Sequence, residues 1–191
     1  MKKILLAVLP LLMACGARDA APDATTDTPA AATNTAAVAD AEATNADPAG
    51  EEGLTIFAPN LSAKSGSNIC VDVQAQGFKQ LLSMQYTLAW NKNVLEFTEL
   101  KNFNLPHLDN NDFGLHLAKD GLLTCAWIDD SLKGATVADN AALYQVCFKV
   151  KGKAGEESYF KITDRPTSIE VIDLREKSVP LKKKAGSVKV E

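Results

Sequence analysis

The clearest pattern along the chain is a strict alternation of apolar and polar residues over residues 82–90. Leucine, methionine, tyrosine, leucine and tryptophan occupy the even positions, and small or polar residues occupy the odd positions. Side chains on a strand point alternately to opposite faces, so this segment is predicted to be a β-strand with one apolar and one polar face. Asn91-Lys92-Asn93 interrupts the alternation and Val94 resumes it, which predicts a tight corner between two strands.

Similar short segments recur throughout residues 54–191. Turn signals such as Ser65-Gly66-Ser67, Asp120-Gly121 and Ala185-Gly186 separate them at intervals of roughly 8–12 residues. No segment carries a helical period over three turns. The pattern therefore predicts an all-β fold, and we expect a jelly-roll β-sandwich of about nine strands.

The start of the chain has the composition of an export signal. Two lysines precede an apolar run over residues 4–13, which is too short to span a bilayer because a span needs about 20 apolar residues. The sequence Leu12-Met13-Ala14-Cys15 then matches the bacterial lipobox, and by that resemblance Cys15 is lipidated. The alternative is an ordinary signal peptide with a chance cysteine. We expect residues 1–15 to be a lipoprotein signal, and Gly16 favours anchoring in the outer membrane, with the domain periplasmic or surface-exposed.

Residues 16–53 differ sharply in composition from the rest of the chain. They are rich in alanine, aspartate, threonine and proline and contain no aromatic residue, so they are predicted to form a disordered tether. This segment holds one arginine against eight acidic residues, whereas residues 54–191 are nearly neutral. A nucleic-acid-binding domain would carry a basic excess, so no nucleic-acid partner is expected. Residues 54–191 have the size of one domain with a core of its own.

Candidates for catalysis or metal binding are few. His107 and His116 flank Asp109 and Asp112, but their irregular spacing matches no known ligand loop, so a packed, solvated loop is favoured over a metal site. No serine or cysteine has an adjacent general base, and no pair of carboxylates has a glycosidase signature. We therefore expect neither an enzyme nor a cofactor.

Strand periodicity predicts which of the remaining aromatic and sulfur-containing side chains are buried. Trp90 and Trp127 fall on the apolar faces of their strands, which favours the core over an exposed platform for sugars. Cys125 lies between Leu123 and Trp127 on one face and is expected to be a buried thiol. The pattern alone does not place the tyrosines at positions 144 and 159.

Several segments of residues 54–191 together form a recognisable series. They are Cys70 to Val73, Ser83 to Phe97, Asp120 to Trp127, Leu143 to Val150 and Gly186 to Val190. With these segments the chain resembles the cohesin domain, in particular cohesin-like domains of Bacteroidota. The resemblance implies a nine-stranded jelly roll that is related in fold to cellulose-binding modules. It also implies a non-catalytic module that binds dockerins, the calcium-loaded modules of polysaccharide-degrading enzymes, through a flat sheet face.

The resemblance implies a partner-binding face that includes the strand over residues 82–90. Its polar side offers Ser83, Gln85 and Thr87 as the predicted contact residues. Many clostridial cohesins carry an asparagine and an aspartate where Ser83 and Gln85 stand here. The first hypothesis is a cell-surface module that binds a dockerin-like protein in polysaccharide utilisation, and the alternative is a carbohydrate-binding module that holds glycan at the cell surface.

The resemblance also bears on the cysteines. The strands that contain Cys70 and Cys147 are neighbours in the cohesin fold, and an exported chain meets an oxidising compartment. We expect a Cys70–Cys147 disulfide, and the alternative is two buried free thiols.

Overall fold

The structure is a computed structural model that describes residues 53–191. The predicted signal over 1–15, the lipidation site Cys15 and the predicted tether, except Gly53, lie outside the described residues. No helix within the described part is long and apolar enough to cross a membrane.

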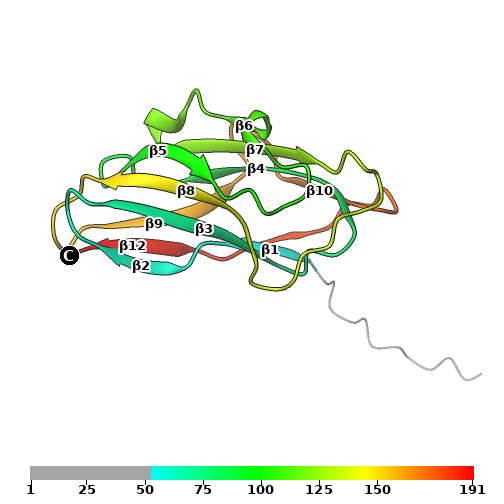
Figure 1. Cartoon of the computed structure of the whole chain (residues 1–191), viewed down its shortest axis with the longest axis horizontal. Helices are drawn as coiled ribbons and strands as arrows, with labels where there is room; N and C mark the ends of the chain where they lie inside the picture. The colour runs from blue at the N-terminus through cyan, green and yellow to red at the C-terminus, as the bar shows by residue number, and fades with distance from the viewer. Residues whose placement is uncertain (1–52) are drawn as a thin grey trace, which may run out of the picture. The chain divides into compact units, whose positions relative to one another are not determined.

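The described residues form strands and two short 3-10 helices (Figure 1). In chain order these are β1 (Leu54–Phe57), β2 (Asn60–Ala63), β3 (Asn68–Gln76), β4 (Leu81–Ala89), β5 (Leu95–Lys101), η1 (Asn110–Asp112), β6 (Phe113–Gly114), η2 (Ala118–Asp120), β7 (Leu122–Ile128), β8 (Ala142–Val150), β9 (Glu157–Thr163), β10 (Glu170–Asp173), β11 (Leu181–Lys183) and β12 (Gly186–Val190).

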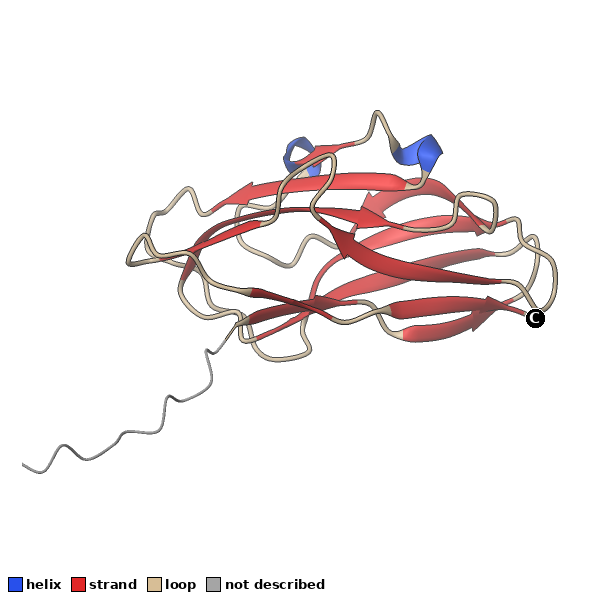
Figure 2. Cartoon of the chain, turned by 180° about the vertical axis from the view of Figure 1, so that it is seen from behind, coloured by secondary structure: helices blue, strands red, loops and turns tan. Residues whose placement is uncertain are grey.

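The strands form two sheets that enclose one core (Figure 2). One sheet has the order β11-β1-β3-β8-β5, and the other has the order β2-β12-β9-β4-β7-β6. In the second sheet β4 is central, because β7 pairs with one of its edges while β9 and β10 share the other. The all-β sandwich is as predicted.

The structure has twelve strands in the described part, more than the expected nine. The pattern did not predict β2 or β6. The residues of β2 are alternately exposed and half-buried, and the strand adds in parallel to β12 at the sheet edge, so it has no buried face to produce a hydrophobic signal. The strand β6 is only two residues long and interrupts what was predicted to be a loop.

The alternation over residues 82–90 places one face of β4 in the core. Met84, Tyr86 and Leu88 are buried between the sheets. At the predicted corner Trp90 is 7% exposed, and its Nε1 donates to the Leu95 carbonyl at 3.0 Å. Its ring also packs against two phenylalanines, and the second tryptophan is fully buried. Both tryptophans are therefore core residues, as predicted.

A small polar cluster lies inside the sandwich. The Tyr86 and Tyr144 hydroxyls are 2.8 Å apart, and both side chains are fully buried. The free Cys125 thiol is buried, as predicted, and lies beside Tyr86. Burial is the main cause that raises the pKa of all three groups, so they remain neutral.

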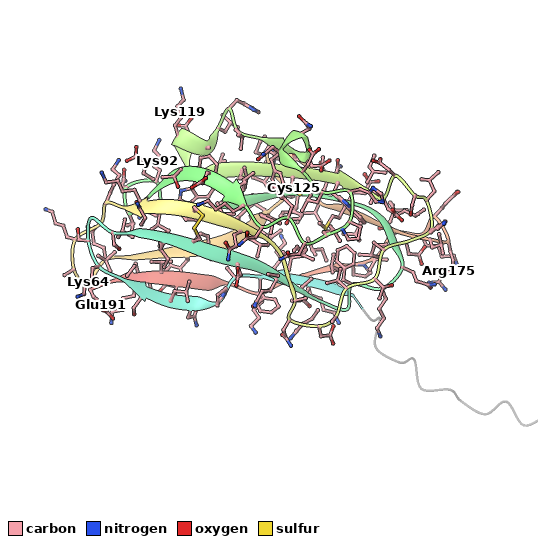
Figure 3. The ribbon with its side chains drawn as sticks, in the orientation of Figure 1. Lys64, Lys92, Lys119, Cys125, Arg175 and Glu191 are labelled. Carbon is pink, nitrogen blue, oxygen red and sulfur yellow. A yellow bond between two sulfur atoms is a disulfide. The ribbon has the colours of Figure 1, made fainter. Side chains whose placement is uncertain are left out.

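A disulfide joins Cys70 on β3 to Cys147 on β8, in agreement with the prediction (Figure 3). The two residues are directly opposite each other in the antiparallel pair. The bond lies on the outer side of the five-stranded sheet, where Cys70 is exposed and Cys147 is largely covered.

Candidate functional site

The outer side of β4 and its neighbours forms a continuous surface of polar and apolar side chains. Residues directly opposite each other on antiparallel strands point to the same side of a sheet. Ser83 is opposite Ile128 on one side and Ile172 on the other, and Gln85 is opposite Ala126. We call this surface the β4 face, with the members Ser83, Gln85, Ala126, Ile128, Glu170 and Ile172.

Two of the three predicted contact residues are accessible on the β4 face. Ser83 and Gln85 are both half-exposed. Thr87 points to the same side but is 0% exposed, because the segment after β9 crosses over it. The Thr167 backbone N–H donates to the Thr87 hydroxyl oxygen at 3.2 Å. This finding corrects the expectation for Thr87, which anchors a loop and has no surface to offer a partner.

The β4 face has little relief. A shallow hollow of about 200 Å³ lies between Ser83, Gln85 and Ile128. Ile128 is 58% exposed and is the more exposed of the two isoleucines among the members, because Ile172 is half-buried. The neighbouring strand β6 has no side chain at Gly114, where a Cβ would collide with the Thr124 hydroxyl. No side chain therefore rises above the sheet at this position. A flat surface with one apolar protrusion suits a broad macromolecular contact better than an enclosed small ligand.

The polar chemistry of the β4 face is modest. The Gln85 amide Nε2 donates to the Glu170 carboxylate at 3.2 Å, and Glu170 is the one charged member of the face. This bond fixes the direction of the Gln85 side chain. The face therefore offers one carboxylate and one oriented amide beside an apolar residue.

The sequence contained signals for part of this surface that the prediction did not use. Leu123, Cys125 and Trp127 were predicted to point inward, so Ala126 and Ile128 must point outward. The alternation thus already placed an apolar isoleucine on the outer side of the strand. No local signal indicates Glu170, because β10 reaches β4 through long-range pairing with a register irregularity at its end.

A buried carboxylate holds the turn that follows β7. The Asp129 side chain accepts hydrogen bonds from the Ser131 hydroxyl at 2.7 Å, from its backbone N–H at 3.1 Å, and from the backbone N–H groups of Lys133 and Gly134 at 3.2 and 2.9 Å. These bonds, led by the Ser131 hydroxyl, lower the pKa of Asp129. The turn fixes the end of β7 next to β4, since the Asp129 backbone N–H also donates to the Leu82 carbonyl.

Three of the four residues considered for a metal site have other partners. His107 Nε2 lies 3.5 Å from the Asp129 carboxylate. Asp109 and Asp112 form a reciprocal capping box at the helix η1. Across residues 53–191 no group of three or more histidine, cysteine or acidic side chains is arranged to hold a metal ion.

The family of the chain follows from comparison with known domains. The family model described as "Cohesin domain" matches residues 54–190, so the chain belongs to the cohesin domain family. Cohesin domains are non-catalytic binding modules. No curated protein gives a significant match.

Solved cohesin structures share the fold at low sequence identity. The sixth cohesin of scaffoldin B from Acetivibrio cellulolyticus, in complex with a dockerin, is 17% identical with a TM-score of 0.62, over 73% of this chain and 99% of that chain. A cohesin of Clostridium thermocellum, also in complex with a dockerin, is 16% identical with a TM-score of 0.60, over 73% and 99%. A non-cellulosomal cohesin from the archaeon Archaeoglobus fulgidus is 20% identical with a TM-score of 0.57, over 73% and 91%. These likenesses establish the fold alone.

Proposed function

We propose that this chain is a cell-surface cohesin module that presents the β4 face to a dockerin-like protein partner in polysaccharide utilisation. The observation that carries the proposal is the flat surface around Ser83, Gln85 and the exposed Ile128, on the central strand of a sheet in a cohesin fold. Cohesins of similar fold have been solved with dockerins bound.

We further propose that the module is lipid-anchored through Cys15 in the outer membrane and is of the Bacteroidota type. The lipobox Leu12-Met13-Ala14-Cys15 supports the anchor, and it lies outside the described residues. The acidic composition of residues 16–53 supports a spacer between the membrane and the domain, because like charges repel one another.

Glycan binding by the β4 face is the less favoured alternative. Sugar platforms use exposed aromatic side chains, and the members of the β4 face include none. A protein surface with a matching apolar depression would contact Ile128, and a hydrogen-bonding group would pair with the oriented Gln85 amide.

A charge placed in the β4 face tests the proposed site. The full chain is mixed with calcium-loaded dockerin modules encoded by the same organism, and affinity is measured by isothermal titration calorimetry. Gln85→Lys is expected to weaken binding at least about tenfold, because the new ammonium would pair with Glu170, neutralise the one carboxylate of the face and remove the oriented amide offered to the partner.

A matched control exists on the other sheet. Gln74→Lys makes the same chemical change at a half-exposed position of β3, and its binding should equal that of the unaltered chain. Equal weakening by both variants would contradict a site on the β4 face. If no dockerin binds the unaltered chain, the proposed partner class is wrong.

A further inference from the structure

A second hollow opens on the outer side of the sheet that contains the β4 face, at the opposite end of β4. Its volume is about 280 Å³, and its lining includes Tyr159, Glu157 and Lys161 of β9 together with Ala89 and Asn91. Glu157, Tyr159 and Lys161 alternate with buried residues of β9, so all three point outward. We call this second hollow the Tyr159 hollow. Gln85 and Ala89 are roughly 13 Å apart along β4, so the Tyr159 hollow is separate from the β4 face.

The Tyr159 hollow contains an accessible aromatic ring. Tyr159 is 52% exposed, and it is the one aromatic residue among the exposed large hydrophobic side chains of the described part. Ala89 lies opposite Lys161 in the neighbouring strand, and its small side chain leaves space within the hollow. An exposed ring beside open space offers a face for stacking with an apolar surface.

The side chains of the hollow are held in place before any ligand arrives. The Tyr159 hydroxyl donates to the Glu157 carboxylate at 2.6 Å. The Asn91 backbone N–H donates to the buried Ser158 hydroxyl at 3.0 Å, and the Asn91 side-chain oxygen accepts from the Asn93 backbone N–H at 3.0 Å. Because these side chains are already ordered, binding a ligand does not incur the free-energy cost of ordering them.

The same arrangement leaves polar groups without protein partners. Within residues 53–191, neither the Asn91 amide nitrogen nor the Lys161 ammonium group donates a hydrogen bond to another residue. Hydrogen bonds from the Ser187 and Tyr159 hydroxyls lower the pKa of Glu157, so its carboxylate is an ionised acceptor at neutral pH. The hollow thus combines donors and an acceptor beside a ring, and its two charged side chains have opposite signs.

We propose that the Tyr159 hollow binds a neutral hexopyranose unit of an oligosaccharide. A pyranose has an apolar face of C–H groups that would stack on the Tyr159 ring, while its hydroxyls donate to Glu157 and accept from Asn91 and Lys161. Glu157 and Lys161 have opposite charges, so the lining itself gives no net electrostatic advantage to an ionised sugar; Lys189, which lies opposite Glu157 on β12, is outside the lining. This site does not depend on the proposed protein partner.

The test is a titration of the full chain followed by two-dimensional NMR of backbone and side-chain amides. Cellohexaose and mannohexaose serve as neutral probes and a galacturonic-acid oligomer as the anionic probe. A neutral probe should shift the Asn91 side-chain signal and the amides of residues 157–161, with a Kd on the order of 1 mM. Tyr159→Ala should weaken binding about tenfold, whereas Tyr159→Phe retains the ring and should stay within about threefold.

The controls separate this site from the other proposal. Gln85→Lys should bind the neutral probe as the unaltered chain does, whatever its effect on a protein partner. The proposal is overturned if neither neutral probe shifts these signals at about 10 mM, if only the anionic probe binds, or if Tyr159→Ala and Tyr159→Phe bind equally.

Discussion

Asp129 shows how a single carboxylate can determine the geometry next to the proposed binding face. Four hydrogen bonds reach this buried side chain, and together they lower its pKa. In the unfolded chain the pKa returns to about 3.9. A carboxyl whose pKa is lowered by folding adds stability above its unfolded pKa, and this stability is lost as the pH falls through the folded value.

Replacing this carboxyl should therefore change the pH dependence of folding. The free energy of unfolding, from urea titrations between neutral pH and about pH 3, should be lower for Asp129→Asn at neutral pH. The difference from the unaltered chain should begin to shrink as the pH falls below about 4, where the carboxyl of the unfolded chain takes up a proton before the native one does. The control is Asp130→Asn, an exposed neighbour that accepts no hydrogen bond in the described part, and its curve should follow the unaltered chain. Parallel curves for Asp129→Asn and the unaltered chain would contradict this role.

At the scale of elements, the Cys70–Cys147 disulfide links β3 and β8. The two residues are 77 positions apart, and closing a loop of that size in the unfolded chain corresponds to about 4 kcal/mol in the entropic model. The double variant Cys70→Ser, Cys147→Ser should lose roughly 2–4 kcal/mol in the free energy of unfolding by urea titration. A reductant should destabilise the unaltered chain and leave the double variant unchanged. The prediction fails if non-reducing mass spectrometry finds both thiols free.

The elements also show what the sequence could predict and what it could not. Period-2 alternation was sufficient to predict β4, β7 and β8 and to assign Trp90 and Trp127 to the core, because burial on one side of a strand is a local constraint. The burial of Thr87 was not predictable in this way, since it depends on a loop about 80 residues further along the chain. Long-range packing likewise decided which outward residues of β4 remain accessible.

At the scale of the whole molecule, the core and the β4 face are under different constraints. The core is built from residues between Leu54 and Val190, and the family match covers the same range. The face that would define the partner instead carries Ser83 and Gln85, residues that depart from the clostridial pattern. Core packing tolerates many sequences with similar apolar patterning, whereas recognition depends on a few exposed groups. The fold is therefore shared at identities near 17%, while recognition by the β4 face depends on its own few exposed residues.

The proposed lipid anchor leads to a prediction about the whole chain. Loss of the anchor should change where the protein is located in the cell but not how the domain folds. A diacylated Cys15 would supply two acyl chains, which suffice for stable attachment to a membrane. Cys15→Ser should move the protein from the membrane fraction to the soluble fraction of cells. The same change should leave the thermal unfolding midpoint of the domain unaltered, because the core begins at Leu54. Mass spectrometry of the unaltered protein should find a lipid-modified N-terminus at Cys15. A Cys15→Ser protein that remains in the membrane fraction would show that attachment has another cause.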